Sequence, residues 1–210
     1  MLCGVVIGYD PGGNGAHGVA ELHFRDGKAT TLTTRILQTT EEAISTLENL
    51  PSLAALGVDT LTCWGTGVSA WRPADRWLRE RYKAMQNSVV TPNGLFGSMG
   101  LNGMAVLIAA RQKFPSVVIT ETHPKVLYWQ LSSKKYEFQS SKGAMDGVLA
   151  AAFGIFDETA SEPEWDAAVS AFAALSGLLG NWTHDLHALP PEKGERLVRP
   201  CGSTHYFWPE

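Results

Sequence analysis

Acidic side chains stand where the predicted strands end or an apolar helix begins; they are Asp10, Asp59, Glu121 and Asp146. In open α/β sheets, ligands bind where the carboxyl ends of strands meet helix termini. Carboxylates grouped there raise one another's pKa unless a cation neutralises them. Hard oxygen ligands favour Mg²⁺ or Mn²⁺ over zinc. The pattern therefore predicts a divalent-metal site in which these carboxylates are both ligands and catalytic groups.

Each acid also has a purely structural interpretation. Asp10 precedes Pro-Gly-Gly and suits the first position of a turn, while Asp59 suits a hydrogen bond to its own loop. Glu121 suits a solvated strand position, and Asp146 suits an interaction with the first-turn amides of its helix. Only their joint placement favours a shared site.

Basic residues near these acids are candidate substrate contacts. Arg72 and Arg76 open a predicted helix beyond Asp59, where they would line a phosphate path or form a solvated helix face. Lys142 precedes Asp146 by one helical turn, which suits either a contact with the scissile phosphate or a surface ion pair. His123 is a candidate for proton transfer, with capping or packing before the following proline as the alternative.

The elements that must position these groups follow the order β-β-β-α-β-α-α-β-α-α-α. Strands are predicted at 2–9, 17–24 and 28–37, with Asp26-Gly27 as a hairpin turn, and again at 53–61 and 116–122. Helices are predicted at 39–49, 73–86, 125–131, 141–156 and 163–179, together with one that follows a glycine-rich loop at 93–103 and ends near Lys113. Three consecutive strands followed by βαβ units predict an α/β fold with an antiparallel edge on a parallel core.

Composition is that of an ordinary globular chain. The 210 residues are 44% hydrophobic and 18% charged, which predicts a single domain over 1–210 with an irregular tail at about 190–210. A net charge of −4 does not suggest a general nucleic-acid binder, whose surface is normally basic.

Membrane and secretion signals are absent from the sequence pattern. The longest small and apolar runs, 147–156 and 167–180, are too short to span a bilayer, and the N-terminus lacks the features of a signal peptide. The cysteines at 3, 63 and 201 form neither a disulfide framework nor a zinc motif. We therefore expect a reducing, cytoplasmic setting and no membrane partner.

Several short motifs, in their order, resemble the RNase H-like superfamily and, more closely, a bacterial and archaeal family of uncharacterised, predicted RNase H-like nucleases. The matching segments lie between about residue 4 and residue 200: Gly8-Tyr9-Asp10, Gly57-Val58-Asp59, Arg72 to Arg76, Glu121 to Pro124, Met145 to Ala152 and Arg196 to Pro200. The resemblance implies a mixed five-stranded sheet flanked by helices and a two-metal site for phosphodiester cleavage. In that site Asp10 would bridge both ions, and Asp59, Glu121 and Asp146 would complete their shells.

The leading hypothesis is thus a metal-dependent nuclease or phosphodiesterase that acts on a nucleic acid or a nucleotide. One alternative is a catalytically idle scaffold that keeps the fold and binds a partner, which suits the acidic charge. Another is a phosphotransferase of the actin and sugar-kinase type, because residues 10–15 resemble the phosphate-gripping hairpin of those proteins. Such enzymes use two copies of this fold, whereas 210 residues hold only one.

A stripe of small residues marks the last predicted helix. It comprises Ala167, Ala168, Ala171, Ala173 and Ala174, and it ends at Leu178-Leu179. Small side chains allow close packing, so the stripe predicts either a homodimer contact or tight packing within the chain.

Overall fold

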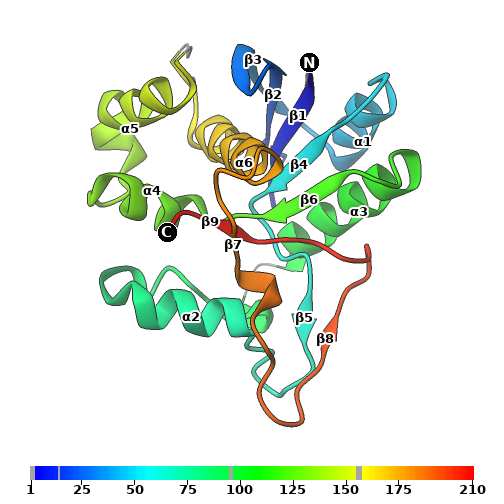
Figure 1. Ribbon diagram of the computed structural model, residues 1–210, viewed down its shortest axis with the longest axis vertical. Coiled ribbons are helices and arrows are strands. Elements are labelled where there is room, and N and C mark those ends of the chain that lie inside the picture. Colours follow the sequence, from blue (N-terminus) through cyan, green and yellow to red (C-terminus); the bar gives the residue numbers. More distant parts are fainter. Residues whose placement is uncertain (1–2, 14, 95–96, 155–157) are drawn as a thin grey trace.

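A mixed five-stranded sheet with the strand order β3-β2-β1-β4-β6 forms the centre of the molecule (Figure 1). β1 (Cys3–Asp10), β2 (His17–Arg25) and β3 (Lys28–Leu37) form an antiparallel meander. β4 (Ala55–Val58) is parallel to β1, and β6 (Val118–Glu121) is parallel to β4. The predicted fold class is confirmed, and the carboxyl ends of β1, β4 and β6 share one edge. The computed structural model describes residues 3–13, 15–94, 97–154 and 158–210.

Local chemistry explains the meander and the first helix. Asp26 and Gly27 both adopt positive φ, as a two-residue hairpin turn requires. The hydroxyl of Thr39 accepts a hydrogen bond from the backbone of Glu42 and so caps α1 (Thr40–Glu48). These elements have the bounds that the sequence predicts to within about two residues.

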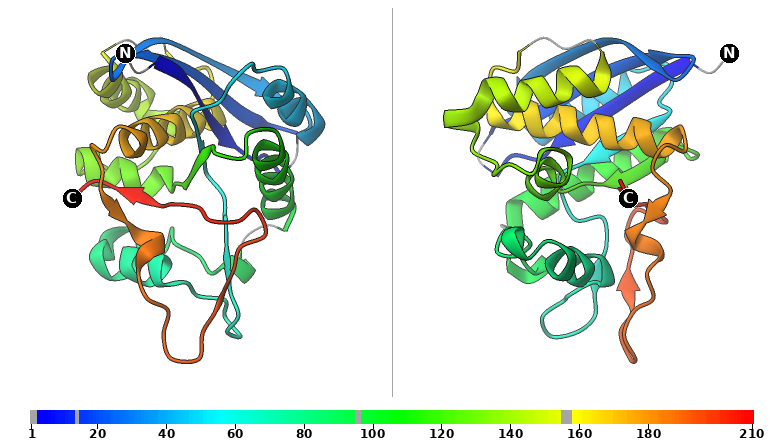
Figure 2. Two further views of the ribbon diagram at one scale, coloured as in Figure 1. Left: turned by 45° about the vertical axis from the view of Figure 1, so that its right-hand side comes forward. Right: turned by 60° about the vertical axis from the view of Figure 1, so that its left-hand side comes forward.

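Helices cover both faces of the sheet (Figures 1 and 2). α6 (Glu162–Leu178) crosses one face over β1, β2 and β4. α1 packs with α3 (Gly97–Lys113) beside the other face. Alternate strand residues divide between two apolar cores, with Val6 on the α6 side and Val5 and Ile7 on the α3 side.

Glycines in the strands bring α6 unusually close to the sheet. A Cβ on any of them would lie within 1.8 to 1.9 Å of a carbonyl oxygen of α6: Gly8 faces Ala167, Gly57 faces Ser170 and Gly18 faces Pro163. The small-residue stripe of α6 therefore packs within the chain, where its alanines are fully buried. The face that suggested a homodimer is not exposed.

The remaining elements lie around this sheet, and one of them, α5 (Phe138–Phe153), packs on α6. They are α2 (Pro73–Arg81), α4 (Pro124–Ser132), α5, short 3-10 turns at Lys83–Met85, Pro92–Gly94 and Leu186–Ala188, and two small ribbons. One ribbon joins β5 (Trp64–Gly65) to β8 (Leu197–Val198), and the other joins β7 (His184–Asp185) to β9 (Phe207–Trp208). Figure 2 shows the C-terminal segment returning alongside β6, where His205 forms a parallel bridge with Thr120.

Several predicted boundaries were wrong. α3 already begins at Gly97, so part of the predicted 93–103 loop is helical. Position 103 in this helix requires glycine because a Cβ there would collide with Thr60. Asp146 lies in the middle of α5, which begins at Phe138 and is kinked at Ser141, instead of opening that helix. Residues 155 and 156 of the predicted helix lie outside the described residues. The mostly irregular tail carries two short paired strands, β8 and β9. None of the helices in the described ranges is long and apolar enough to cross a membrane.

Candidate active site

Asp10 and Asp59 meet at the carboxyl edge of the sheet. Tyr9 and Val58 are partners in the parallel pairing of β1 with β4, so the next residue of each chain segment, Asp10 or Asp59, emerges beside the other. The Asp59 amide donates to the Tyr9 carbonyl at 2.9 Å and continues this pairing. Asp10 is only 8% exposed. Asp59 is partly exposed, and among the described residues neither carboxylate accepts a side-chain or backbone hydrogen bond.

The turn after Asp10 is held by His17. Its Nδ1 accepts hydrogen bonds from the Tyr9 hydroxyl at 2.8 Å and from the Gly12 amide at 3.3 Å, and its ring stacks on that of Tyr9. His17 is buried, and burial lowers its pKa. A neutral ring that accepts both bonds keeps the first residues after β1 in one conformation.

Asp166, which the sequence analysis did not select, joins this pair from α6. Its neighbour Ala167 lies directly over Gly8, so the first turns of α6 pass above the end of β1. Asp166 is buried, and its Oδ1 accepts a hydrogen bond from the Tyr136 hydroxyl at 2.7 Å. A signal that could have identified Asp166 is its position directly before a stripe of alanines that must pack on a sheet.

Burial raises the pKa of all three carboxyls, and the charges of neighbouring carboxylates raise it further. Burial is the largest cause in each case, and it raises the pKa of Asp59 to about 7. The pKa values of Asp10 and Asp166 also rise well above the ordinary range, through burial and then through the charge of Asp59. Lys125 lowers the pKa of Asp10 and Asp59, but less than burial raises it. We call Asp10, Asp59 and Asp166 the carboxylate triad; its negative charge is incompletely balanced.

Glu121 lies at the same edge but is fully compensated. Its Oε2 accepts from Arg72 Nη1 at 2.7 Å, and its Oε1 accepts from Arg72 Nη2 at 2.5 Å. The Thr62 amide and hydroxyl donate to Oε2 at 2.9 and 3.1 Å. Burial alone would raise the pKa of Glu121, but Arg72 and His187 together hold it well below its usual range. Burial lowers the pKa of His187, but its contacts with Cys63 and Glu121 outweigh this effect and raise the pKa to about 9.

Asp146 is compensated in a different place. Lys142 donates to its Oδ2 at 2.8 Å, and the Thr159 hydroxyl donates to its Oδ1 at 2.9 Å. Asp146 does not contribute to the raised pKa of any carboxyl in the triad. The structure thus brings Asp10 and Asp59 together, sets Glu121 next to them in an ion pair, and leaves Asp146 with Lys142.

The predicted substrate contacts differ in their availability. Arg72 is 2% exposed, and its guanidinium faces Asp75, Glu121 and the Cys63 carbonyl. Arg76 is partly exposed and pairs with glutamates at 192 and 195. Lys142 is partly exposed as well and bridges to Glu158. His123 Nε2 lies 3.0 Å from the Ser88 carbonyl oxygen, and burial lowers its pKa.

Solved structures resemble this arrangement, although no family model and no curated protein matches the chain. RuvC of T. thermophilus in complex with a Holliday junction substrate has a TM-score of 0.51 and 14% sequence identity, over 84% of this chain and 96% of that one. A second Thermus thermophilus RuvC structure has a TM-score of 0.51 and 13% identity, over 84% and 97% of the two chains. The fold is RNase H-like. At such low identity the likeness extends to the fold alone.

The triad of this RNase H-like fold can be tested for its fit to a divalent cation. Carboxylate oxygens are the donors that Mg²⁺ and Mn²⁺ prefer, and a cation would relieve the repulsion that raises their pKa values. Within the described ranges, however, no three His, Cys, Asp or Glu side chains lie close enough together to hold a metal ion as they stand. The donors therefore fit a divalent cation by type and charge, but not by their present spacing.

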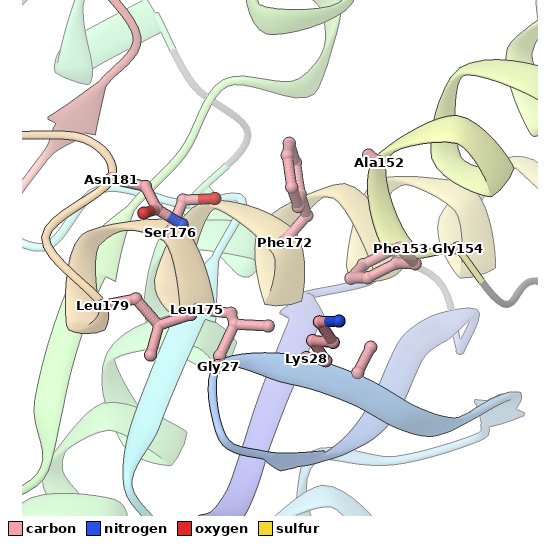
Figure 3. Close-up of a pocket in the computed structure, with 11 residues that line it drawn as sticks. Gly27, Lys28, Ala152, Phe153, Gly154, Phe172, Leu175, Ser176, Leu179 and Asn181 are labelled. Carbon is pink, nitrogen blue, oxygen red and sulfur yellow. The ribbon is translucent and has the colours of Figure 1, made fainter. Parts of the chain in front are cut away.

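The larger of two cavities in this RNase H-like fold lies away from the triad, so the lining residues and not the volume identify the site. A cavity of about 310 Å³ lies between the β2–β3 turn, the end of α5 and the second half of α6 (Figure 3). Figure 3 shows that Phe153, Phe172, Leu175 and Leu179 line it, with Lys28 as the charged side chain. A smaller cavity of about 170 Å³ is lined by Asp59, Glu121, His123 and Lys125. Only the second touches the triad.

Proposed function

We propose that the chain is a metal-dependent nuclease or phosphodiesterase of RNase H-like fold, which hydrolyses phosphodiester bonds in a nucleic acid or nucleotide at the carboxylate triad. The observation that carries this proposal is the group of carboxyls at the ends of β1 and β4 and in α6, whose pKa values are raised by burial and by neighbouring carboxylates at the carboxyl edge of the sheet. What a divalent cation supplies when bound at such carboxylates is an activated water and charge stabilisation of the leaving oxygen.

The proposed ligand set keeps Asp10 and Asp59 and takes Asp166 in place of Glu121 and Asp146. The reason is charge: Arg72 already neutralises Glu121, and Lys142 already pairs with Asp146. Such carboxylates gain less from a cation than those that still repel one another. In this proposal Glu121 and Arg72 hold the end of β6 in place beside the triad.

Other residues of the chain support the triad. The Tyr136 hydroxyl orients Asp166, and the Lys125 ammonium, on an exposed side chain, lies near enough to lower the pKa of Asp10 and Asp59. An exposed lysine beside a phosphodiester site suits a contact with the substrate phosphate. The cysteines are all free, and a reducing, cytoplasmic setting stays a prediction from their spacing.

Calorimetric titration of Mg²⁺ and Mn²⁺ into the metal-free protein tests the ligand set. Asp166→Asn and Asp10→Asn should each weaken binding at least about tenfold, a loss of roughly 1.4 kcal/mol. Asp146→Asn is the matched control, because Asp146 is as buried as Asp166 and also lies on a helix. It should bind as the wild type does. Equal loss in all three variants, or loss in Asp146→Asn alone, would contradict the triad.

Activity is tested separately, with labelled single-stranded, duplex and junction DNA and RNA. Cleavage by the wild type that requires Mg²⁺ or Mn²⁺ and is lost in Asp10→Asn supports the nuclease proposal. Metal binding without cleavage of any substrate would favour a scaffold that retains the fold. Transfer of phosphate from ATP would instead favour the phosphotransferase alternative.

A further inference from the structure

The cavity beside Asp59 has an apolar side and a polar side. Val89, Val90 and Met99 form part of the apolar side, and Asp59, His123 and Lys125 contribute to the polar side. Its volume of about 170 Å³ is smaller than the roughly 300–1,000 Å³ of pockets that enclose a whole small molecule. The cavity therefore has room for one ring system of a ligand, with the rest of the ligand outside.

His123 lines the cavity and carries a hydrogen-bond acceptor that has no partner among the described residues. A carbonyl oxygen only accepts, so the 3.0 Å contact with Ser88 places the ring hydrogen on Nε2. Nδ1 then carries a lone pair. That atom is buried and has no partner among the described residues. Because buried polar atoms are nearly always paired, a donor from outside the protein, either a water O–H or a ligand N–H, would complement Nδ1.

Carboxylates also line the polar side of the cavity, so a phosphate fits there beside Lys125 only together with the proposed divalent cation. Lys125 lines this cavity, and its ammonium lies near enough to lower the pKa of Asp10 and Asp59. The partner of Lys125, Glu162, lies 3.8 Å away with both side chains exposed, and such pairs are weak enough to be displaced. A ligand that matches all these features has a flat ring with an N–H edge joined to a phosphate.

We propose that this cavity receives the nucleobase of a nucleotide whose phosphate lies at Lys125 and the carboxylate triad. The base packs against Val89, Val90 and Met99, and one of its N–H groups donates to His123 Nδ1. Apolar side chains commonly grip a base that has left its stack. This inference rests on the proposed phosphodiester chemistry for the position of the phosphate, while the base pocket itself is defined by its own lining.

The test is a calorimetric titration of the full chain, with Mg²⁺ present, by the four deoxynucleoside 5′-monophosphates and by 2-deoxyribose 5-phosphate, which lacks a base. We expect at least one base-bearing nucleotide to bind tenfold or more tightly than the sugar phosphate. Val90→Trp should fill the mouth of the cavity and abolish that difference. Val198→Trp is the matched control, because Val198 is 51% exposed and Val90 is 47% exposed. It should behave as the wild type does.

A second arm uses single-stranded oligonucleotides with and without one abasic position. A base-dependent difference that Val90→Trp removes, seen only with oligonucleotides, assigns the cavity to a base within a strand. The same difference seen with mononucleotides assigns it to a free nucleotide as well. His123→Phe, which keeps a ring but removes Nδ1, should reduce the base-dependent difference in whichever arm shows it.

The base pocket is overturned if the sugar phosphate binds as tightly as every nucleotide and the abasic oligonucleotide binds as tightly as the intact one. It is also overturned if Val90→Trp and Val198→Trp behave alike. These readouts do not require catalysis, so base binding with no cleavage would count against the proposed nuclease activity and leave the pocket standing. Cleavage with no base dependence would support the proposed nuclease activity and count against the base pocket.

Discussion

Asp59 and Glu121 end neighbouring strands, yet their electrostatic surroundings are opposite. Val58 and Glu121 are partners in the β4–β6 pairing, so the two carboxyls emerge from the same edge of the sheet. Burial raises the pKa of Asp59 to about 7, whereas Arg72 and its neighbours hold the pKa of Glu121 well below its usual range. The difference lies in the counter-charge: the fold supplies one to Glu121 and leaves Asp59 without a matching one. A buried carboxyl is a candidate ligand only where its charge is not already balanced.

The largest effect should follow from removing the counter-charge of Glu121. Arg72→Met removes the guanidinium that neutralises the buried carboxylates of Glu121 and Asp75, and the expected loss of stability is about 3–5 kcal/mol. Urea unfolding monitored by circular dichroism measures this loss. Arg76→Met is the control, since Arg76 makes a more exposed ion pair with glutamates at 192 and 195. Its effect should be much smaller, and equal losses would show that Glu121 is not specially dependent on Arg72.

The pH dependence of stability should carry opposite contributions from the two carboxyls. The pKa of Asp59 is about 7 in the folded chain and 3.8 as the reference value. Between these values the folded state binds the extra proton, so the Asp59 contribution to stability falls as pH rises through this window, by an amount on the order of a few kcal/mol. Glu121 has a lowered pKa, so its stabilisation is complete above its ordinary pKa and is lost as pH falls below it.

Unfolding free energies of the metal-free wild type and Asp59→Asn, measured by urea between pH 4 and pH 8, separate these contributions. The difference between the two proteins should grow in favour of Asp59→Asn as pH rises from about 4 to about 7 and then level off. A difference that stays constant across this range would show that the pKa of Asp59 is not raised in the folded protein.

The smallest effect concerns the cation nearest the triad. Lys125→Met should raise the pKa of Asp59 further, by less than about one unit because the ammonium is exposed to solvent. Carboxyl ¹³C NMR titration of Asp59 in the metal-free protein detects the shift. Lys142→Met, which removes the partner of Asp146, is the control and should leave the Asp59 titration unchanged. An unchanged Asp59 pKa in both variants would show that the charge of Lys125 does not act on Asp59.

Much of the scaffold followed from local sequence features. The Asp26-Gly27 turn, the Thr39 cap and the β-branched strands were readable because each depends on residues close in the chain. The order of the elements was enough to predict the mixed sheet, since three consecutive strands and later βαβ units have few ways to pair. The start of α3 was missed because glycine by itself indicates a loop, and the close approach of Gly103 to the distant Thr60 is visible only in the folded chain.

The sequence by itself determined that an acid follows β1 and another follows β4, and parallel pairing then required the two to meet. Only the tertiary structure decided which further carboxyl joins them. Arg72 neutralises Glu121 across 49 positions of sequence, and close packing of α6 on strand glycines brings Asp166 over the end of β1. Strand ends are local properties that a sequence displays. Charge balance depends on distances between groups that only the folded chain brings together.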